Sequence, residues 1–190
     1  MLQRRFLLGA GLSVALPAWA TDPEALALIR TGGVVVAFRH ALAPGTFDPP
    51  GFRPGDCRTQ RNLSEEGRTQ ARRIGNWFQA RTLVPARVRA SPWCRCLDTA
   101  RLAFGQAEVW AALGSPNGNV EATNEAHLRE LRQALALASR QPGRFEVWVT
   151  HMFVLSALVG SSTDSGEGLV LRVDAAGVPR VLARLPSSTV

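Results

Sequence analysis

The sequence contains no lysine, so arginine supplies all 22 of its basic residues. Arginine presents a planar fork of N–H donors, which suits the paired oxygens of phosphate and carboxylate groups. The formal net charge is +7, but the arginines are scattered along the chain and do not alternate with aromatic residues in a stripe. This distribution argues against a protein that binds nucleic acid.

The sequence also lacks internal repeats and any obvious linker between domains. It has 190 residues, of which 46% are hydrophobic and 19% charged, so it is long and apolar enough for one globular domain with a buried core. After the first 20 residues, no segment is apolar enough to span a membrane. We therefore expect one domain and no stable membrane span once those residues are removed.

Cysteine is scarce, with only Cys57, Cys94 and Cys96. Cys94 and Cys96 are too close together for a common zinc motif, and no second pair accompanies them. We therefore expect no metal site. In an oxidising compartment, one disulfide from Cys57 to either Cys94 or Cys96 is expected, with one thiol left over.

The first 20 residues have the pattern of a signal peptide. Arg4-Arg5 gives a short positive start, residues 6–16 are apolar, and Ala18-Trp19-Ala20 is a small-x-small cleavage site. We expect residues 1–20 to be removed, leaving a domain over residues 21–190 in the periplasm or outside the cell. The alternative is an uncleaved anchor, for which the apolar run is short against the ~20 residues of a span. The paired arginines leave the general and twin-arginine export routes both open.

Apolar segments of strand length alternate with helical patterns along the remaining chain. Strands are expected at 33–38, 86–90, 108–110 and 145–150, with short strand patterns between 166 and 184. Helices are expected at 22–30, 65–80 with Ser64 as N-cap, from Ser91-Pro92 to about 105, 121–140 and 152–159. This alternation predicts an α/β fold, a three-layer sandwich with a central, mainly parallel sheet and helices on both faces.

Polar side chains follow three of the expected strands. The first strand leads into Arg39-His40, the second leads through Ser91-Pro92 to Arg95, and the strand at 145–150 leads into His151. Because ligands bind beyond the carboxyl ends of the strands in an open α/β sheet, we expect these side chains to meet at one rim. Residues 41–62, a long Pro-, Gly- and Asp-rich loop, begin at the same rim, and such loops are often functional.

Two arginines and two histidines at one rim suit a phosphate ester. Arg39 and Arg95 can bind phosphate oxygens with paired donors, and the expected helix start at Pro92 adds backbone N–H groups. A neutral His40 can attack phosphorus, while a protonated His151 stabilises the oxygens as charge develops. Singly, each residue can equally be structural, as a salt-bridged arginine or a satisfied strand-end histidine. Their joint placement favours phosphoryl transfer without a metal or cofactor.

Four segments resemble motifs of the histidine phosphatase superfamily, whose fold is phosphoglycerate-mutase-like. They are Phe38-Arg39-His40-Ala41 after an apolar strand, Asn62 to Arg68 at a helix start, Ser91 to Ala100, and Val149-Thr150-His151. Their order is that of the family, and the resemblance covers about residues 33–160. Each motif is weak alone, but the set of four is specific.

The resemblance implies a phosphoric monoester hydrolase of the histidine acid phosphatase type, in which His40 becomes a phosphohistidine that water then hydrolyses. It assigns the phosphate to Arg39, Arg95 and His151, and Asn62 is expected as a further substrate-binding residue. The expected substrate is a small-molecule or glycolipid phosphate ester. Small exported relatives that act on the heptose phosphate of the lipopolysaccharide core suggest one such ester. Nothing in the sequence sets the oligomeric state.

Three positions depart from the pattern of the family. Ala41 stands where a glycine usually follows the first histidine, and Met152 where a glycine usually follows the second. Residues 111–115 contain no acid, although many family members carry there the glutamate that protonates the leaving group. Glu121 is our candidate for this general acid, and Asp48 is the alternative. The missing acid at residues 111–115 also supports a rival hypothesis, a non-catalytic protein that binds phosphate or a phosphoester on the same fold.

Overall fold

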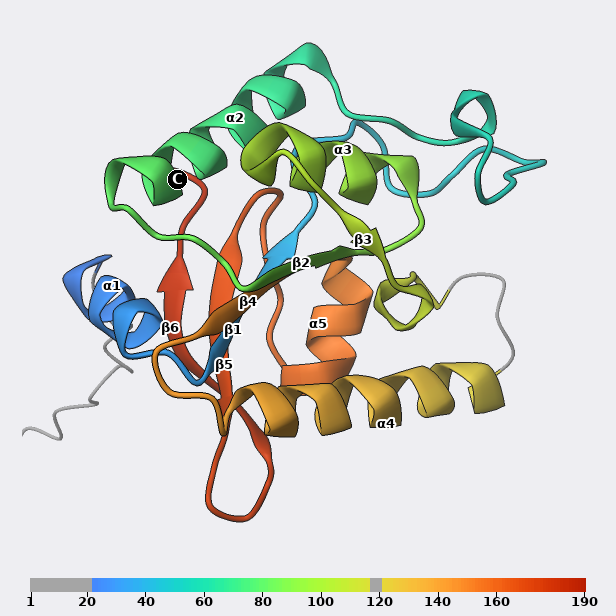
Figure 1. Cartoon of the computed structure of the whole chain (residues 1–190). Helices are drawn as coiled ribbons and strands as arrows, with labels where there is room; N and C mark the ends of the chain where they lie inside the picture. Colours follow the sequence, from blue (N-terminus) through green and yellow to red (C-terminus); the bar gives the residue numbers. More distant parts are fainter. Residues whose placement is uncertain (1–21, 117–120) are drawn as a thin grey trace, which may run out of the picture.

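A six-stranded mixed sheet forms the centre of the protein in a computed structural model that describes residues 22–116 and 121–190 (Figure 1). The expected signal peptide, residues 1–20, lies outside these ranges. The strands are β1 (Val34–Arg39), β2 (Arg87–Ala90), β3 (Glu108–Val109), β4 (Phe145–Thr150), β5 (Gly168–Val173) and β6 (Pro179–Leu185). Their order is β3-β2-β4-β1-β5-β6, in which the first four are parallel and β5 and β6 form an antiparallel hairpin against β1.

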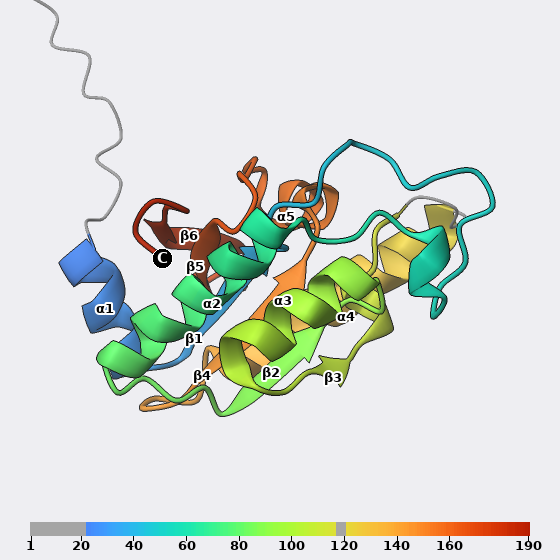
Figure 2. The ribbon, with the colours of Figure 1, turned by 90° about the horizontal axis from the view of Figure 1, so that it is seen from above.

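Helices cover both faces of this sheet, which confirms the expected α/β sandwich of three layers. They are α1 (Asp22–Thr31), α2 (Glu65–Ala80), α3 (Cys94–Phe104), α4 (Glu121–Ala138) and α5 (Met152–Val159), with short 3-10 helices η1 (Cys57–Thr59) and η2 (Ala111–Leu113). One core joins the sheet to α1, α2 and α3, and the other joins it to α4, α5 and η2. Figure 2 shows α2 and α3 lying over β1, β4 and β2. No helix in the described ranges is long and apolar enough to cross a bilayer.

The central strand β1 is buried on both faces, which explains its unbroken apolar sequence. Val34, Val36 and Phe38 enter one core, whereas Val35 and Ala37 enter the other. Its last residue, Arg39, pairs with Thr150 of β4, and Val149 pairs with Ala90 at the end of β2. The three strands therefore end side by side, and this register brings the polar residues that follow them to one edge.

Helix α2 begins as the sequence predicts, with the Ser64 hydroxyl accepting a hydrogen bond of 3.0 Å from the N–H of Gly67. Gly67 permits the helix to lie directly against the chain that leaves the sheet after His40. A Cβ atom at this position would clash with the carbonyl oxygen of Leu42. The start of the helix is thereby fixed close to the edge where the strands end.

The predicted helix start at Ser91-Pro92 is wrong, because α3 begins at Cys94 and Trp93 is its N-cap residue without a side-chain cap. The Ser91 hydroxyl lies instead 2.8 Å from His151 Nε2. The N–H of Cys94, which was expected to face a phosphate, donates to Oε1 of Gln60 at 2.9 Å. The Ser91 hydroxyl also accepts the backbone N–H of Trp93 at 3.3 Å, so it contacts both a backbone group and a buried histidine. A loop glutamine, and not an anion, accepts the N–H of Cys94.

Cys57 and Cys94 form the disulfide, with their Cα atoms 5.7 Å apart, and Cys96 is a buried free thiol. This is one of the two pairings that the sequence left open. The bond joins η1, in the long loop 41–62, to the first residue of α3. The loop and the helix start are therefore covalently tied beside the strand ends.

We expect the double variant Cys57→Ser/Cys94→Ser to lose about 4 kcal/mol of unfolding free energy, the loop-closure value for a separation of 37 residues. Denaturant titration measures the loss. A reductant should destabilise the unmodified protein by a similar amount and leave the double variant unchanged. Equal stability of the oxidised and reduced proteins would contradict this role of the bond.

Candidate active site

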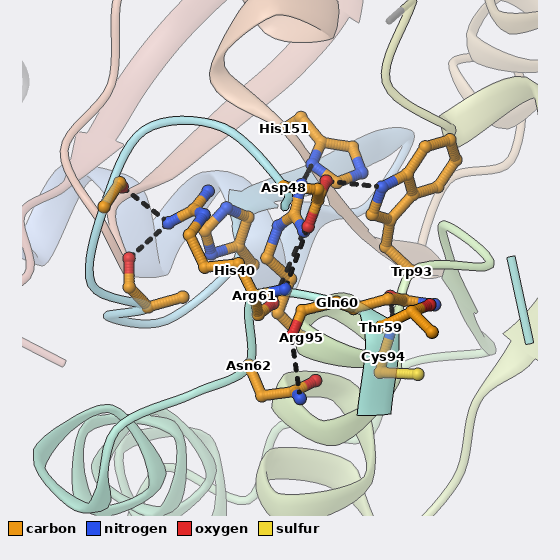
Figure 3. Close-up of polar contacts among 12 residues, drawn as sticks. His40, Asp48, Thr59, Gln60, Arg61, Asn62, Trp93, Cys94, Arg95 and His151 are labelled. Atoms are coloured by element: carbon orange, nitrogen blue, oxygen red, sulfur yellow. Dashed lines mark hydrogen bonds and ion pairs between the residues drawn. The ribbon is translucent and has the colours of Figure 1, made fainter. Parts of the chain in front are cut away.

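A cavity of about 80 Å³ lies where β1, β2 and β4 end. It is lined by residues from the end of β1, the loop 41–62, the first turn of α3 and the start of α5 (Figure 3). The lining residues are Arg39, His40, Gly45, Thr46, Asp48, Arg61, Arg95, Ser115, His151, Met152 and Phe153. The structure therefore brings together the two arginines and two histidines that the sequence singled out.

His40 is 2% exposed, and its Nδ1 lies 2.8 Å from the carbonyl oxygen of Ala41. Because a carbonyl only accepts, Nδ1 carries the proton and Nε2 keeps its lone pair. The pKa of His40 is lowered to about 3, mainly by burial and also by the positive charges of nearby arginines, while the hydrogen bond to Ala41 opposes the shift. His40 is thus neutral, with the lone pair that a nucleophile needs. Ala41 has no positive φ, so this position does not require glycine.

His151 is held between two partners, with Nε2 2.8 Å from the Ser91 hydroxyl and Nδ1 3.4 Å from a terminal nitrogen of Arg95. A guanidinium only donates, so Nδ1 accepts and the ring proton lies on Nε2, facing Ser91. Burial holds the pKa of His151 well below its usual value, and the positive charges of Arg95, Arg61 and Arg39 act in the same direction. An anion in the cavity would oppose that effect and favour a second proton on Nδ1.

Arg95 is 4% exposed and forms an ion pair of 2.8 Å with Asp48. The same Asp48 oxygen accepts a hydrogen bond from the backbone N–H of Arg61 at 3.0 Å. The other oxygen accepts one from the indole N–H of Trp93 at 3.2 Å. Burial raises the pKa of Asp48, but these hydrogen bonds and the charge of Arg95 outweigh it, so the net shift is downward. An ionised carboxylate with both oxygens engaged is a poor proton donor. Asp48 therefore lies in the cavity as the charged partner of Arg95, and these contacts favour its ionised form.

Arg39 reaches from the end of β1 across the start of α5. One terminal nitrogen donates to the carbonyl oxygen of Thr163 at 2.7 Å and to the Met152 sulfur at 3.8 Å. Met152, which stands where the family usually has glycine, therefore both narrows the cavity and helps to fix Arg39.

Arg61 is a third cavity arginine that the sequence analysis missed. One terminal nitrogen donates to the carbonyl oxygens of Ala43 and Gly45. The Nε atoms of Arg39, Arg61 and Arg95 are all buried without a hydrogen-bond partner among the described residues. The three guanidinium groups line one cavity, and their positive charge and N–H donors suit an anionic ligand there. The only sequence signal for Arg61 was its position directly before the motif that begins at Asn62.

Asn62 does not line the cavity, which corrects its assignment as a substrate-binding residue. Its amide nitrogen donates to the carbonyl oxygens of Cys57 at 2.7 Å and Gln60 at 3.1 Å, so it fixes the shape of the loop. Glu121 is the first residue of α4, but its side chain lies outside the part that the structure describes. Within that part, Asp48 is the only carboxylate that lines the cavity, and no group of three or more metal-ligating side chains is found.

Comparisons with known proteins agree with this fold. The model of the histidine phosphatase superfamily (branch 1) matches residues 55–130. The structure is similar to the protein histidine phosphatase SixA complexed with tungstate, at 18% identity and a TM-score of 0.53, covering 82% of this chain and 97% of that one. It is also similar to the alpha-ribazole phosphatase of Shigella flexneri, at 16% identity and a TM-score of 0.53, covering 78% of this chain and 95% of that one.

A third similar structure is the mycobacterial glucosyl-3-phosphoglycerate phosphatase complexed with VO3, at 17% identity and a TM-score of 0.54, covering 78% of this chain and 96% of that one. No curated protein matches the chain significantly. The chain has the phosphoglycerate-mutase-like fold, and its expected resemblance to the histidine phosphatase superfamily is confirmed. The matched residues contain Arg61 and Arg95, whereas His40 and His151 lie outside them.

We expect Arg61→Ala to weaken the binding of inorganic phosphate by about tenfold or more, because hydrogen bonds to charged groups contribute about 1.5–3 kcal/mol. Isothermal titration calorimetry measures the affinity. Arg58→Ala is the matched control, since Arg58 lies in the same loop but is exposed and paired with Asp56. Equal losses in both variants would mean that only the net charge of the loop matters.

Proposed function

We propose that this chain is a phosphomonoesterase of the histidine acid phosphatase type, which hydrolyses a phosphate ester through a phosphohistidine on His40 and needs no metal ion. The observation that carries the proposal is the cavity itself. Three guanidinium groups line the cavity together with a neutral histidine whose Nε2 lone pair is available. The guanidinium groups bind the oxygens of the phosphoryl group, and His40 attacks its phosphorus.

The reaction follows from these positions in two steps. Nε2 of His40 forms a bond to phosphorus as the bond to the ester oxygen breaks, and the leaving oxygen receives a proton from a general acid. Water then attacks phosphorus, the P–N bond breaks, and the proton of the water returns to the same acid–base group. Arg39, Arg61 and Arg95 hold the equatorial oxygens throughout, and His151 joins them once the bound anion has raised its proton affinity.

We propose Glu121 as the acid–base group. Among the described residues the competing carboxylate, Asp48, is committed to Arg95 and Trp93. Glu121 begins the helix that follows η2. Many family members carry the acid at the position of residues 111–115, and Glu121 is the first acidic residue after that segment.

The proposed substrate is a small-molecule or glycolipid phosphate ester, not a nucleic acid. Two of the similar structures are named for small phosphate esters, alpha-ribazole phosphate and glucosyl-3-phosphoglycerate, which supports this class. We also propose that the protein acts in the periplasm or outside the cell. The Cys57–Cys94 disulfide supports an oxidising compartment, as does the signal-like pattern of residues 1–20.

A second candidate function is phosphate or phosphoester binding without turnover. The observation that favours it is the engagement of Asp48, which leaves the cavity without an unengaged carboxylate among the described residues. The two functions share the same anion site, and they differ only in whether the bound ester is then hydrolysed.

We expect the protein to hydrolyse an aryl phosphate, and His40→Ala to lose this turnover while still binding inorganic phosphate, because only the nucleophile is removed. Rapid quenching with a radiolabelled ester should trap an acid-labile, alkali-stable phosphoryl group on His40. Phosphate binding without turnover from about pH 4 to 8 would establish the binding protein instead.

We expect Glu121→Gln to lower kcat by about 100-fold for an alkyl phosphate, because general acids contribute factors of this size. A nitrophenyl phosphate should lose much less, since its leaving group departs without a proton. The control is Glu125→Gln, one turn further along α4, where an exposed carboxylate pairs with Arg129. If both esters and both variants behave alike, Glu121 is not the acid.

A further inference from the structure

An apolar groove of about 60 Å³ adjoins the phosphate cavity, and Phe153 lines both. The groove runs between η2, α4 and α5. Its apolar lining comes mainly from Ala112, Gly114, Pro116, Leu128, Phe153 and Ala157. The phosphate cavity, in contrast, is lined mainly by charged and polar side chains. Two sites of opposite character therefore share a wall.

The chain connects the two sites a second time through the segment after η2. Ser115 lines the phosphate cavity, whereas its neighbours Gly114 and Pro116 line the groove. On the opposite side, His151 lies in the cavity and Phe153 begins the groove two residues later, in the first turn of α5. The groove is thus a continuation of the cavity, held by the same elements that position the phosphate.

Phe153 is 40% exposed, and it is one of six large apolar side chains that the described residues leave exposed. Its ring is left beside a cationic cavity, where it contributes nothing to the binding of a phosphate. A ligand pocket typically combines such an apolar wall with a few polar groups that fix orientation. The arrangement suits a ligand with an anionic end and a flat apolar body.

The other neighbour of the phosphate cavity has the opposite chemistry. It lies beyond Arg39 and is lined by Asp164, Glu167 and Arg184, among other polar residues. Arg184 is already paired with Glu167 at 2.6 Å. A leaving group that extends from the phosphate cavity toward α5 meets this polar side or the apolar groove.

We infer that the groove binds the leaving group of the substrate, and that the preferred substrate is a phosphate ester of an aromatic alcohol whose ring packs on Phe153. This inference rests on the proposed function and specifies its substrate class. A phenol, with a pKa of about 10, also leaves with less help from an acid than an alkanol does. That property suits a cavity whose one described carboxylate is held by Arg95.

The test compares two esters, 1-naphthyl phosphate and glycerol 3-phosphate, in three variants. Phe153→Ala removes the ring, and Ala157→Glu places a carboxylate in the groove at an exposed helix position that tolerates it. Both should lower kcat/KM for 1-naphthyl phosphate by about two- to tenfold, the size of an aromatic contact. In Ala157→Glu, hydrolysis of glycerol 3-phosphate and inhibition by inorganic phosphate should change little, because Ala157 lines only the groove. In Phe153→Ala, whose ring also lines the phosphate cavity, the loss should be larger for 1-naphthyl phosphate than for glycerol 3-phosphate. Ser156→Glu adds the same charge one residue away, outside the groove, and should leave both esters unaffected.

An equal loss for both esters, or no loss for either, would overturn the inference, because Phe153 would then shape only the phosphate cavity or nothing at all. Failure of the proposed function has a different signature. If the unmodified protein binds both esters without turnover, the ratio of their affinities and its response to Phe153→Ala decide whether the groove takes the aromatic group.

Discussion

The site depends on the repulsion among positive charges that the fold confines around one cavity. Arg39, Arg61 and Arg95 surround it, and among the described residues a single carboxylate, Asp48, stands against them. Like charges in a partly buried site raise each other's energy, and buried donors without acceptors add to the cost. This arrangement becomes favourable when an anion fills the cavity. Burial, assisted by the same positive charges, lowers the pKa of both His40 and His151 and keeps them neutral until then.

Two kinds of support hold these charges in place. Arg39, His40 and His151 follow strands that are buried in the middle of the sheet, so their backbone positions are fixed by the core. Arg61 and Asp48 belong to a loop that has little regular structure of its own. That loop is held by tertiary contacts at the start of α3, namely the Cys57–Cys94 bond, the Gln60–Cys94 hydrogen bond and the Asp48 contacts. Half of the anion site therefore depends on contacts between segments distant in the sequence.

This division explains how far the sequence could predict the site. Arg39, His40 and His151 follow apolar segments, and the ends of parallel strands meet at one edge, so local pattern and topology suffice for them. Asn62 was predicted to bind substrate but does not line the cavity, whereas Arg61 was not predicted and does line it. The path of this loop depends on long-range contacts that no local sequence pattern encodes. Ser91 was predicted to be a helix cap because a serine directly before a proline is typical of a helix start. Such a cap contributes about 1 kcal/mol. A buried histidine ring needs a partner for its N–H, and Ser91 supplies it while it also accepts the backbone N–H of Trp93.

The contact between Arg95 and His151 couples the binding of the anion to the uptake of a proton. A terminal nitrogen of Arg95 donates to Nδ1 of His151, so one ring nitrogen and one guanidinium donor satisfy each other. A proton on Nδ1 ends that hydrogen bond, because both groups are then donors. Both N–H groups need an acceptor at that moment, and a phosphoryl oxygen in the cavity supplies it. The side chains, and not the N-terminus of α3, whose first N–H is bound to Gln60, therefore sense the charge of the substrate. Because Asp48 holds the other terminal nitrogen of Arg95, the guanidinium keeps its position while its partner changes from a histidine nitrogen to an oxyanion.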